Sequence, residues 1–157
     1  MGCGVIKPIT DKELIMSVAG HPVLWNEISE DDMDFTKWEP DLTEGWLGAY
    51  DSDTLIGVFN LHALNSVTLK IHIMILPQYR GELAYKAARD ALKWIVANVS
   101  FDKVNCEIPD IYPNVIRFAE KCGMVREGIN RRSFRKSGKI HHQISLGITR
   151  SEIEALP

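Results

Sequence analysis

The sequence has few cysteines and no long apolar run. Its three cysteines, Cys3, Cys106 and Cys122, lie far apart, and none forms a C-x-x-C pair. This number and spacing favour neither a disulfide framework nor a zinc site. No apolar run approaches the roughly 18 residues of a membrane-spanning helix, and no basic-then-apolar leader opens the chain. These absences predict a cytoplasmic protein without a membrane span, a structural metal or an export signal.

The chain also lacks internal repeats and low-complexity segments. Hydrophobic residues make up 45% of its 157 residues and charged residues 25%, which is an ordinary balance for a globular protein. A chain of this length can bury a core without disulfides or metals. We therefore expect one domain over residues 1–157.

Charge of one sign is scarce in each half of the chain. Residues 1–60 hold three basic side chains and twelve acidic ones, which leaves −9, and residues 61–157 hold fifteen and nine, which leaves +6. Two interpretations stay open at this point. The halves form two solvated faces, or they form an acidic surface for a cationic partner and a basic surface for an anionic one.

Periodicity and turn residues predict elements in the order β α α β β β α β α β β. The two apolar strands around the long helix should be parallel, because a crossover of about five turns separates them. Residues 29–44 are rich in acids, and their aromatic residues either pin a loop to the core or form the wall of an amine pocket. The order describes an α/β fold with helices on both faces of a mixed sheet. The expected strands are 5–9, 46–50, 55–64, 67–76, 103–108, 124–135 and 139–148, and the expected helices are about 11–19, 22–28, 82–99 and 115–122.

The stretch L-P-Q-Y-R-G-E-L-A-Y, residues 76–85, joins the third of the consecutive strands to the long helix. A strand that stops at a proline, turns through Arg80 and Gly81 and enters a helix presents unpaired amides at the positive end of the helix dipole. This arrangement is suited to binding an anion.

Two patterns flank the long helix and the strand after it. P-x-Y-R-G occupies residues 77–81, and E-K-x-G-M-x-x-E-G occupies residues 120–128. With the order of elements, these residues resemble the GCN5-related N-acetyltransferases (GNAT), and most closely the branch that modifies protein N-termini. The fragment G-I-N-R at residues 128–131, followed by a basic hairpin turn, also resembles that branch. The resemblance covers roughly residues 45–148.

The resemblance implies a three-layer αβα fold, with a sheet of six to seven strands that splays between the fourth and the fifth. Acetyl-CoA would lie in the cleft between these two strands. An amine, either a protein N-terminus or a small polyamine, would attack its thioester directly. The residues implied in coenzyme binding are Ile73, Ile75, Gln78, Tyr79, Arg80, Gly81, Glu82, Leu83, Ala84, Tyr85 and Asn114.

Three residues are candidates for acid–base catalysis. Tyr112, before the short helix, would protonate the leaving thiolate. Glu107 lies on a strand that borders the expected cleft, and an unperturbed histidine such as His72 titrates near neutral pH, so either is a candidate base. A lone histidine on a strand is more often a hydrogen-bonded structural residue.

The basic excess gathers in residues 121–142, which carry +6. A solvated hairpin face, a contact for coenzyme phosphates, and a patch for nucleic acid or acidic protein would each explain this charge. We expect the solvated face. We expect no nucleic-acid partner, because Phe134 is the only aromatic residue there and bases would have no stacking platform.

The sequence also departs from the family pattern. The family has small residues where Leu83 and Tyr85 stand, and these side chains would crowd a pyrophosphate unless both point away. Val115 and Ala119 replace a serine and a tyrosine of the family. Two hypotheses follow: an acetyl-CoA-dependent N-acyltransferase, or a catalytically inactive GNAT-fold protein, for example phage-borne, that binds a partner protein through its charged surfaces. Whether the chain forms a dimer stays open.

Overall fold

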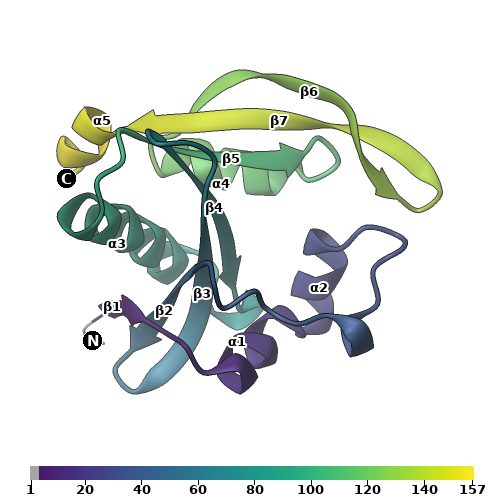
Figure 1. Cartoon of the computed structure of the whole chain (residues 1–157), viewed down its shortest axis with the longest axis horizontal. Coiled ribbons are helices and arrows are strands. Elements are labelled where there is room, and N and C mark those ends of the chain that lie inside the picture. Colours follow the sequence, from purple (N-terminus) through teal and green to yellow (C-terminus); the bar gives the residue numbers. More distant parts are fainter. Residues whose placement is uncertain (1–3) are drawn as a thin grey trace.

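A seven-stranded mixed sheet forms the centre of the structure (Figure 1). The computed structural model describes residues 4–157, so Cys3 lies outside the described residues. The strands are β1 (Gly4–Pro8), β2 (Gly45–Asp51), β3 (Thr54–Ala63), β4 (Thr68–Ile75), β5 (Lys103–Pro109), β6 (Val125–Lys136) and β7 (Lys139–Thr149). The α-helices are α1 (Lys12–Ala19), α2 (Pro22–Ile28), α3 (Glu82–Asn98), α4 (Pro113–Lys121) and α5 (Arg150–Glu154), and the 3-10 helices are η1 (Phe35–Lys37) and η2 (Pro77–Tyr79).

The strands are arranged in the order β1-β2-β3-β4-β5-β7-β6. Only β4 and β5 run parallel, and all other neighbours are antiparallel. The long helix α3 makes the crossover that a parallel pair requires. The predicted meander, the parallel pair and the predicted order of elements are confirmed.

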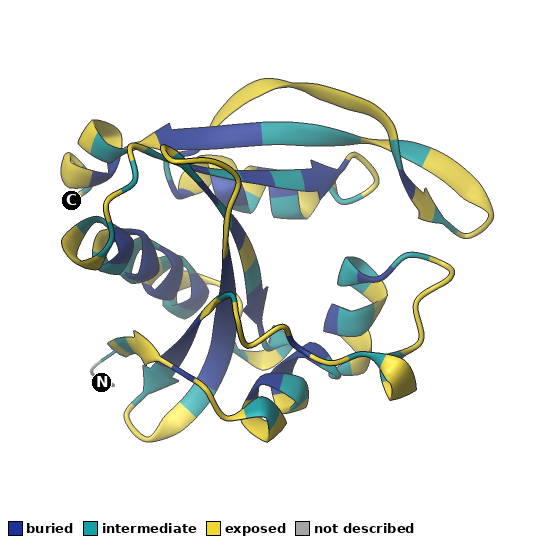
Figure 2. Cartoon of the chain, in the orientation of Figure 1, coloured by how far each residue is buried: buried dark blue, intermediate teal, exposed yellow. Residues whose placement is uncertain are grey.

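One face of the sheet packs against α3, α4 and α5. Side chains that alternate along the strands, such as Phe59, Ile71 and Leu146, point to this face and are buried. The alanines of α3 let the helix approach the sheet closely, and its sheet-facing side is dark blue in Figure 2. The main core therefore lies between the sheet and these helices.

The other face is covered by α1 and α2 over only part of its area. A second cluster there joins Ile15, Val18 and Leu24 of the helices to Val58 and Met74 of the sheet. Asp11 caps α1 through its carboxylate. Beyond this cluster the same face of the sheet carries polar side chains, which are described below.

Residues 29–44 form the expected irregular segment with the 3-10 helix η1. Two aromatic residues of this segment pack on Trp25 of α2: the ring centroid of Trp25 is 5.0 Å from that of Phe35 and 5.7 Å from that of Trp38. These edge-to-face contacts are typical of packed aromatic clusters. The structure thus supports the pinned loop rather than the amine-pocket wall.

The helices differ from the predictions in one boundary and in one additional helix. Helix α4 begins at Pro113 rather than Val115, because proline is well suited to the first helical position. The short helix α5 was not predicted, although Thr149 and Glu152 form a capping box at its start. None of the helices in residues 4–157 is both long and apolar enough to cross a membrane.

Candidate functional site

The parallel strands β4 and β5 are paired only at their first residues. Beyond those pairs β4 continues to Ile75 beside β3, and β5 continues to Pro109 beside β7. The edges that face each other are therefore not paired with one another over the second half of each strand, and the predicted splay is confirmed. The pairs before it are Thr68–Lys103, Leu69–Val104 and Lys70–Asn105.

The chain leaves β4 through η2 and enters α3 at Gly81. This glycine has φ +104°, a conformation that other residues rarely adopt, and no atom lies within 4 Å of where a Cβ would stand. The first amide bonded within α3 is that of Tyr85, which donates to Gly81 O at 3.0 Å. No side chain in residues 4–157 caps this end of the helix. The amides of Glu82, Leu83 and Ala84 are therefore placed to bind an anion.

The side chains of Leu83 and Tyr85 are directed to other elements. Leu83 lines a small pocket with residues of β1, β2 and β3 and packs against the main core. Tyr85 donates its phenol hydrogen to the carbonyl of Lys121 at the end of α4, and its ring meets Phe118 edge-on at 6.5 Å. Tyr85 therefore connects α3 to α4.

Helix α2 is tied to both strands of the splay. An ion pair of 2.6 Å joins Glu27 Oε1 to Arg80 Nη2 in the turn after β4. On the other side, the hydroxyl of Tyr112 donates to Asn26 O at 3.3 Å. The predicted phosphate ligand Arg80 contacts Glu27, and the predicted acid Tyr112 contacts the preceding residue, Asn26. Helix α2 therefore links the turn after β4 to the loop after β5.

Six polar residues from three adjacent strands share one face of the sheet. Directly paired residues point to the same face, and the pairs here are Asn60–His72, His62–Lys70 and Lys70–Asn105. Alternation along β5 adds Glu107 to this face. We call these residues the polar face: Asn60, His62, Lys70, His72, Asn105 and Glu107.

Glu107 is held by two neighbours. Its Oε1 lies 3.6 Å from Lys70 Nζ, and its Oε2 accepts a hydrogen bond of 2.8 Å from Asn130 Nδ2 of β6. Nearby, the Oδ1 atom of Asn105 is buried without a hydrogen-bond partner in residues 4–157. The polar face therefore holds a carboxylate and an unsatisfied carbonyl oxygen at the start of the splay.

His72 lies on the polar face and is exposed. Its ring reaches water, yet surrounding protein lowers its hydration, and this effect, followed by the charge of Lys70, lowers the pKa of His72 below 6.5. Glu44 and Glu107 act in the opposite direction. The exposed side chain leaves the ring accessible for proton exchange with solvent. His72 is thus neutral at neutral pH.

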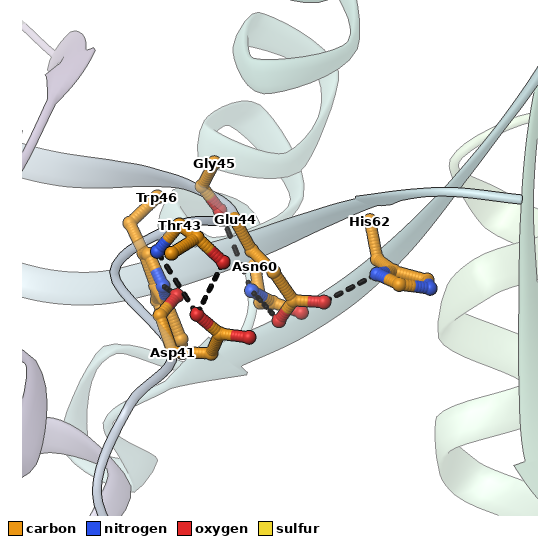
Figure 3. Close-up of polar contacts among 7 residues, drawn as sticks. All are labelled: Asp41, Thr43, Glu44, Gly45, Trp46, Asn60 and His62. Carbon is orange, nitrogen blue, oxygen red and sulfur yellow. Dashed lines mark hydrogen bonds and ion pairs between the residues drawn. The ribbon is translucent and has the colours of Figure 1, made fainter.

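Sequence reasoning missed a carboxylate–imidazole pair beside His72 (Figure 3). Glu44 Oε2 pairs with Nδ1 of His62, and Glu44 Oε1 accepts a hydrogen bond of 3.3 Å from Asn60 Nδ2. Asn60 also contacts Gly45 O at 3.4 Å and is only 7% exposed. The alternation of Asn60 and His62 along a strand was the only available signal, because Glu44 comes from the preceding loop.

The remaining predicted residues lie around the turn and the start of α4. Ile73 is half-buried and Ile75 buried on the α3 side of β4. Gln78 is exposed, Tyr79 packs on the main core, and Asn114 Oδ1 accepts a hydrogen bond from Arg117 within α4. Burial, followed by the charge of Glu27, raises the pKa of Tyr112, so its phenol is protonated at neutral pH.

The β6–β7 hairpin is fastened to the segment after α2. Asp31 accepts hydrogen bonds from the amides of Ser137 and Gly138 at 2.7 and 2.8 Å, and Lys136 Nζ donates to Ser29 O at 2.7 Å. We call this contact the clasp, and it also includes the 2.8 Å bond from the Arg135 amide to Glu30. The clasp joins two segments that are about 105 residues apart in sequence.

A protein-family model matches nearly the whole chain. Residues 6–154 match the family described as "Protein of unknown function (DUF2824)". The chain belongs to this family. A curated protein, "Putative protein p31" of Acyrthosiphon pisum secondary endosymbiont phage 1, is 25% identical to this chain over 68 residues, which are 43% of this chain and 44% of that protein. The match therefore spans less than half of the relative's length.

Solved structures show what fold the DUF2824 chain adopts. The spermidine N-acetyltransferase from Vibrio cholerae in complex with CoA and spermine superposes with a TM-score of 0.80 over 96% of this chain and 98% of that chain, at 18% identity. A chimera of the Vibrio cholerae enzyme gives 0.81 over 98% and 99%, at 19% identity. At sequence identities this low, the superpositions show a shared fold and nothing about a shared activity. The DUF2824 chain has the GNAT fold that its sequence resembles.

Proposed function

We propose that this protein is an acetyl-CoA-dependent N-acyltransferase that acetylates a small cationic amine. The observation that carries the proposal is the separation of β4 from β5 after Lys70 and Asn105, directly before the uncapped start of α3. Backbone groups left unpaired on two diverging parallel strands can bind an extended ligand, and the amides of the helix can bind its phosphates. This combination supports a coenzyme with both features.

The residues present fit acetyl-CoA. Gly81 leaves open space at the turn, and the side chains of Leu83 and Tyr85 pack on neighbouring elements. The backbone of residues 81–84 and the Arg80 guanidinium would hold the phosphates, with Ile73 and Ile75 beside the gap. Bound acetyl-CoA would supply the acetyl group as an activated thioester. Arg80 would exchange its ion pair with Glu27 for a phosphate.

The polar face supports an amine as the acceptor. Glu107 provides negative charge, and the unpartnered Oδ1 of Asn105 provides a buried acceptor for an ammonium hydrogen. The Vibrio cholerae structure contains spermine together with CoA. Spermine is a linear polyamine, and the protein that binds it has the same fold as this chain. We favour a slender amine over a protein N-terminus, because the clasp ties together the segments on either side of this region.

Two of the predicted catalytic residues have protonation states suited to the reaction. His72 is neutral at neutral pH, so it can accept a proton. Tyr112, whose pKa is raised, keeps its proton and can donate it to a leaving thiolate. Glu107 would orient the acceptor rather than act as the base, because Lys70 and Asn130 already engage its oxygens.

A second function is favoured by two contacts. Arg80, the predicted phosphate ligand, is already paired with Glu27, and Tyr85, at a position where the family has a small residue, forms a structural contact between α3 and α4. These contacts support a catalytically inactive protein that binds a partner protein. The partial match to a phage protein is consistent with this alternative.

The test is calorimetric titration of the protein with acetyl-CoA, followed by mass spectrometry of a spermidine incubation. The proposal expects micromolar binding, acetylspermidine as product, and loss of binding in Arg80→Ala. Arg126→Ala, which removes the same charge from β6, is the control and should bind normally. Absence of binding at millimolar acetyl-CoA would rule out the transferase, and binding without transfer to any amine would support the inactive alternative.

A further inference from the structure

The Glu44–His62 pair has the geometry of an oriented proton acceptor. The carboxylate Oε2 contacts Nδ1 of the ring, which places the ring hydrogen on Nδ1 and leaves the lone pair on Nε2 (Figure 3). The buried Asn60 holds the other carboxylate oxygen at 3.3 Å, so the carboxylate is itself fixed. A base that is oriented by a third group is the arrangement found in catalytic triads.

His62 also lies at the right place on the sheet. It pairs in register with Lys70, and Lys70 is the last residue of β4 that pairs with β5. His62 is therefore one strand, about 5 Å, away from the point where the splay begins. A base acts directly or through one water, so this separation is within reach of an acceptor on the polar face.

We propose that His62, oriented by Glu44, is the general base that deprotonates the acceptor amine. This inference rests on the proposed transferase function. A free amine has a pKa near 10, so at neutral pH only about one molecule in a thousand is uncharged, and a base is needed to release the nitrogen lone pair.

The proton and electron balance is complete without a further reactant. The ammonium proton moves to Nε2 of His62, and the nitrogen lone pair forms the new C–N bond to the acetyl carbon. The C–S bond breaks, its electron pair leaves with the sulfur, and Tyr112 or water protonates the thiolate. The acylated nitrogen releases its second proton to solvent, and solvent returns a proton to Tyr112. His62, whose side chain is 49% exposed, returns its proton to solvent.

His62 is better suited to this role than His72. The ring of His72 has no hydrogen-bond partner within the described part of the chain, and its hydration loss and Lys70 oppose its protonation. The charged and titratable groups that face His62 are Glu44 and Asp41 from the loop before β2, and Lys70 and His72 from β4. Glu44 is in direct contact with the ring and would stabilise the imidazolium formed during transfer.

The experiment measures acetyl transfer to spermidine by wild type, His62→Gln, His72→Gln and Glu44→Gln across pH 5.5–9, with His141→Gln as a hairpin control. We expect His62→Gln to lower kcat about 100-fold or more, with KM and the acetyl-CoA dissociation constant changed less than about 2-fold. Added imidazole should restore part of the lost rate, and the variant should lose the fall in rate at low pH. Glu44→Gln should lie between His62→Gln and wild type, and His141→Gln should match wild type.

Three results would overturn the assignment. These are a His62→Gln rate within about 2-fold of wild type, no response to imidazole, or the main loss in His72→Gln instead. Each leaves the transferase function standing. Absence of transfer by the wild type would remove the function and the role of His62 together, while acetyl-CoA binding by calorimetry shows separately whether each variant is folded.

Discussion

Leu83 and Tyr85 show how bulky residues can occupy a turn that usually carries small ones. The conflict depends on the direction of each side chain, and here neither projects into the space at Gly81. Leu83 contributes apolar contact to the main core, and Tyr85 makes a hydrogen bond to the end of α4. The uncapped helix amides that we propose as phosphate ligands are therefore not blocked by these two side chains.

Leu83→Ala should separate packing from coenzyme binding. Removing a half-buried leucine should lower the free energy of unfolding by about 1–3 kcal/mol, because the contacts with β1–β3 are lost. The dissociation constant for acetyl-CoA should stay within about 2-fold of wild type, as measured by calorimetry. Clearly tighter binding would mean that the side chain obstructs the ligand.

The clasp is the element-scale feature that sets the shape of the region above the polar face. It holds the tip of the β6–β7 hairpin against the segment after α2 through Asp31, Glu30 and Lys136. The carboxylate of Asp31 accepts two amide hydrogens, and these bonds lower its pKa below 3.8. A hairpin this long would otherwise have few contacts to fix its tip.

Asp31→Asn should loosen the hairpin tip. The variant should show faster amide hydrogen exchange around Gly138 and a lower melting temperature at pH 5–7, because a neutral amide accepts these hydrogens less strongly. The folded pKa of Asp31 lies below its usual value, so its contribution is present above pH 3.8 and is lost as the pH falls through the folded pKa. The difference from wild type should therefore shrink in acid.

Asp32→Asn is the matched control for this substitution. It removes the same charge one residue away, and Asp32 is exposed. Equal effects of the two substitutions would show that net charge, rather than the clasp, fixes the hairpin.

For the whole molecule, the sheet unites two cores and two regions of opposite charge. The main core and the smaller one share strands, since Phe59 and Val58 are neighbours in β3 but point to opposite faces. The acidic segment after α2 and the basic hairpin meet in the clasp. Part of the charge asymmetry is thus balanced within the chain, and it gives weaker support for a charged partner than the sequence implied.

Because both cores share the sheet, residues 1–157 should unfold as one cooperative unit. We expect a single calorimetric transition whose calorimetric and van't Hoff enthalpies agree, and coincident denaturation curves by tryptophan fluorescence and circular dichroism. Trp46, which packs in the smaller core, reports on that side of the sheet. Two separate transitions would contradict the single domain.

Local patterns were sufficient for the elements and their order. Alternation of apolar residues located the strands, the alanine-rich face located α3, and the P-x-Y-R-G turn lay where the splay ends. Helix α5 was missed although Thr149 and Glu152 carry a capping-box signal, because a helix of 5 residues is too short to show a helical period. Of the candidate site, Arg80, Gly81, His72, Glu107 and Tyr112 could be named in advance because each sits at a strand end or on a polar strand face.

The sequence by itself determined the fold class, the parallel pair and the position of the turn before the long helix, because these follow from periodicity and from residues adjacent in the chain. Only the tertiary structure decided where Leu83 and Tyr85 point, that Glu27 holds Arg80, and that Glu44 orients His62. The physical reason is that these contacts join residues at least 18 positions apart in the chain, and a distant partner leaves no periodic signal in either segment. The sequence shows the polar residues of these strands one by one. Their chemistry depends on the neighbours that the folded sheet places beside each of them.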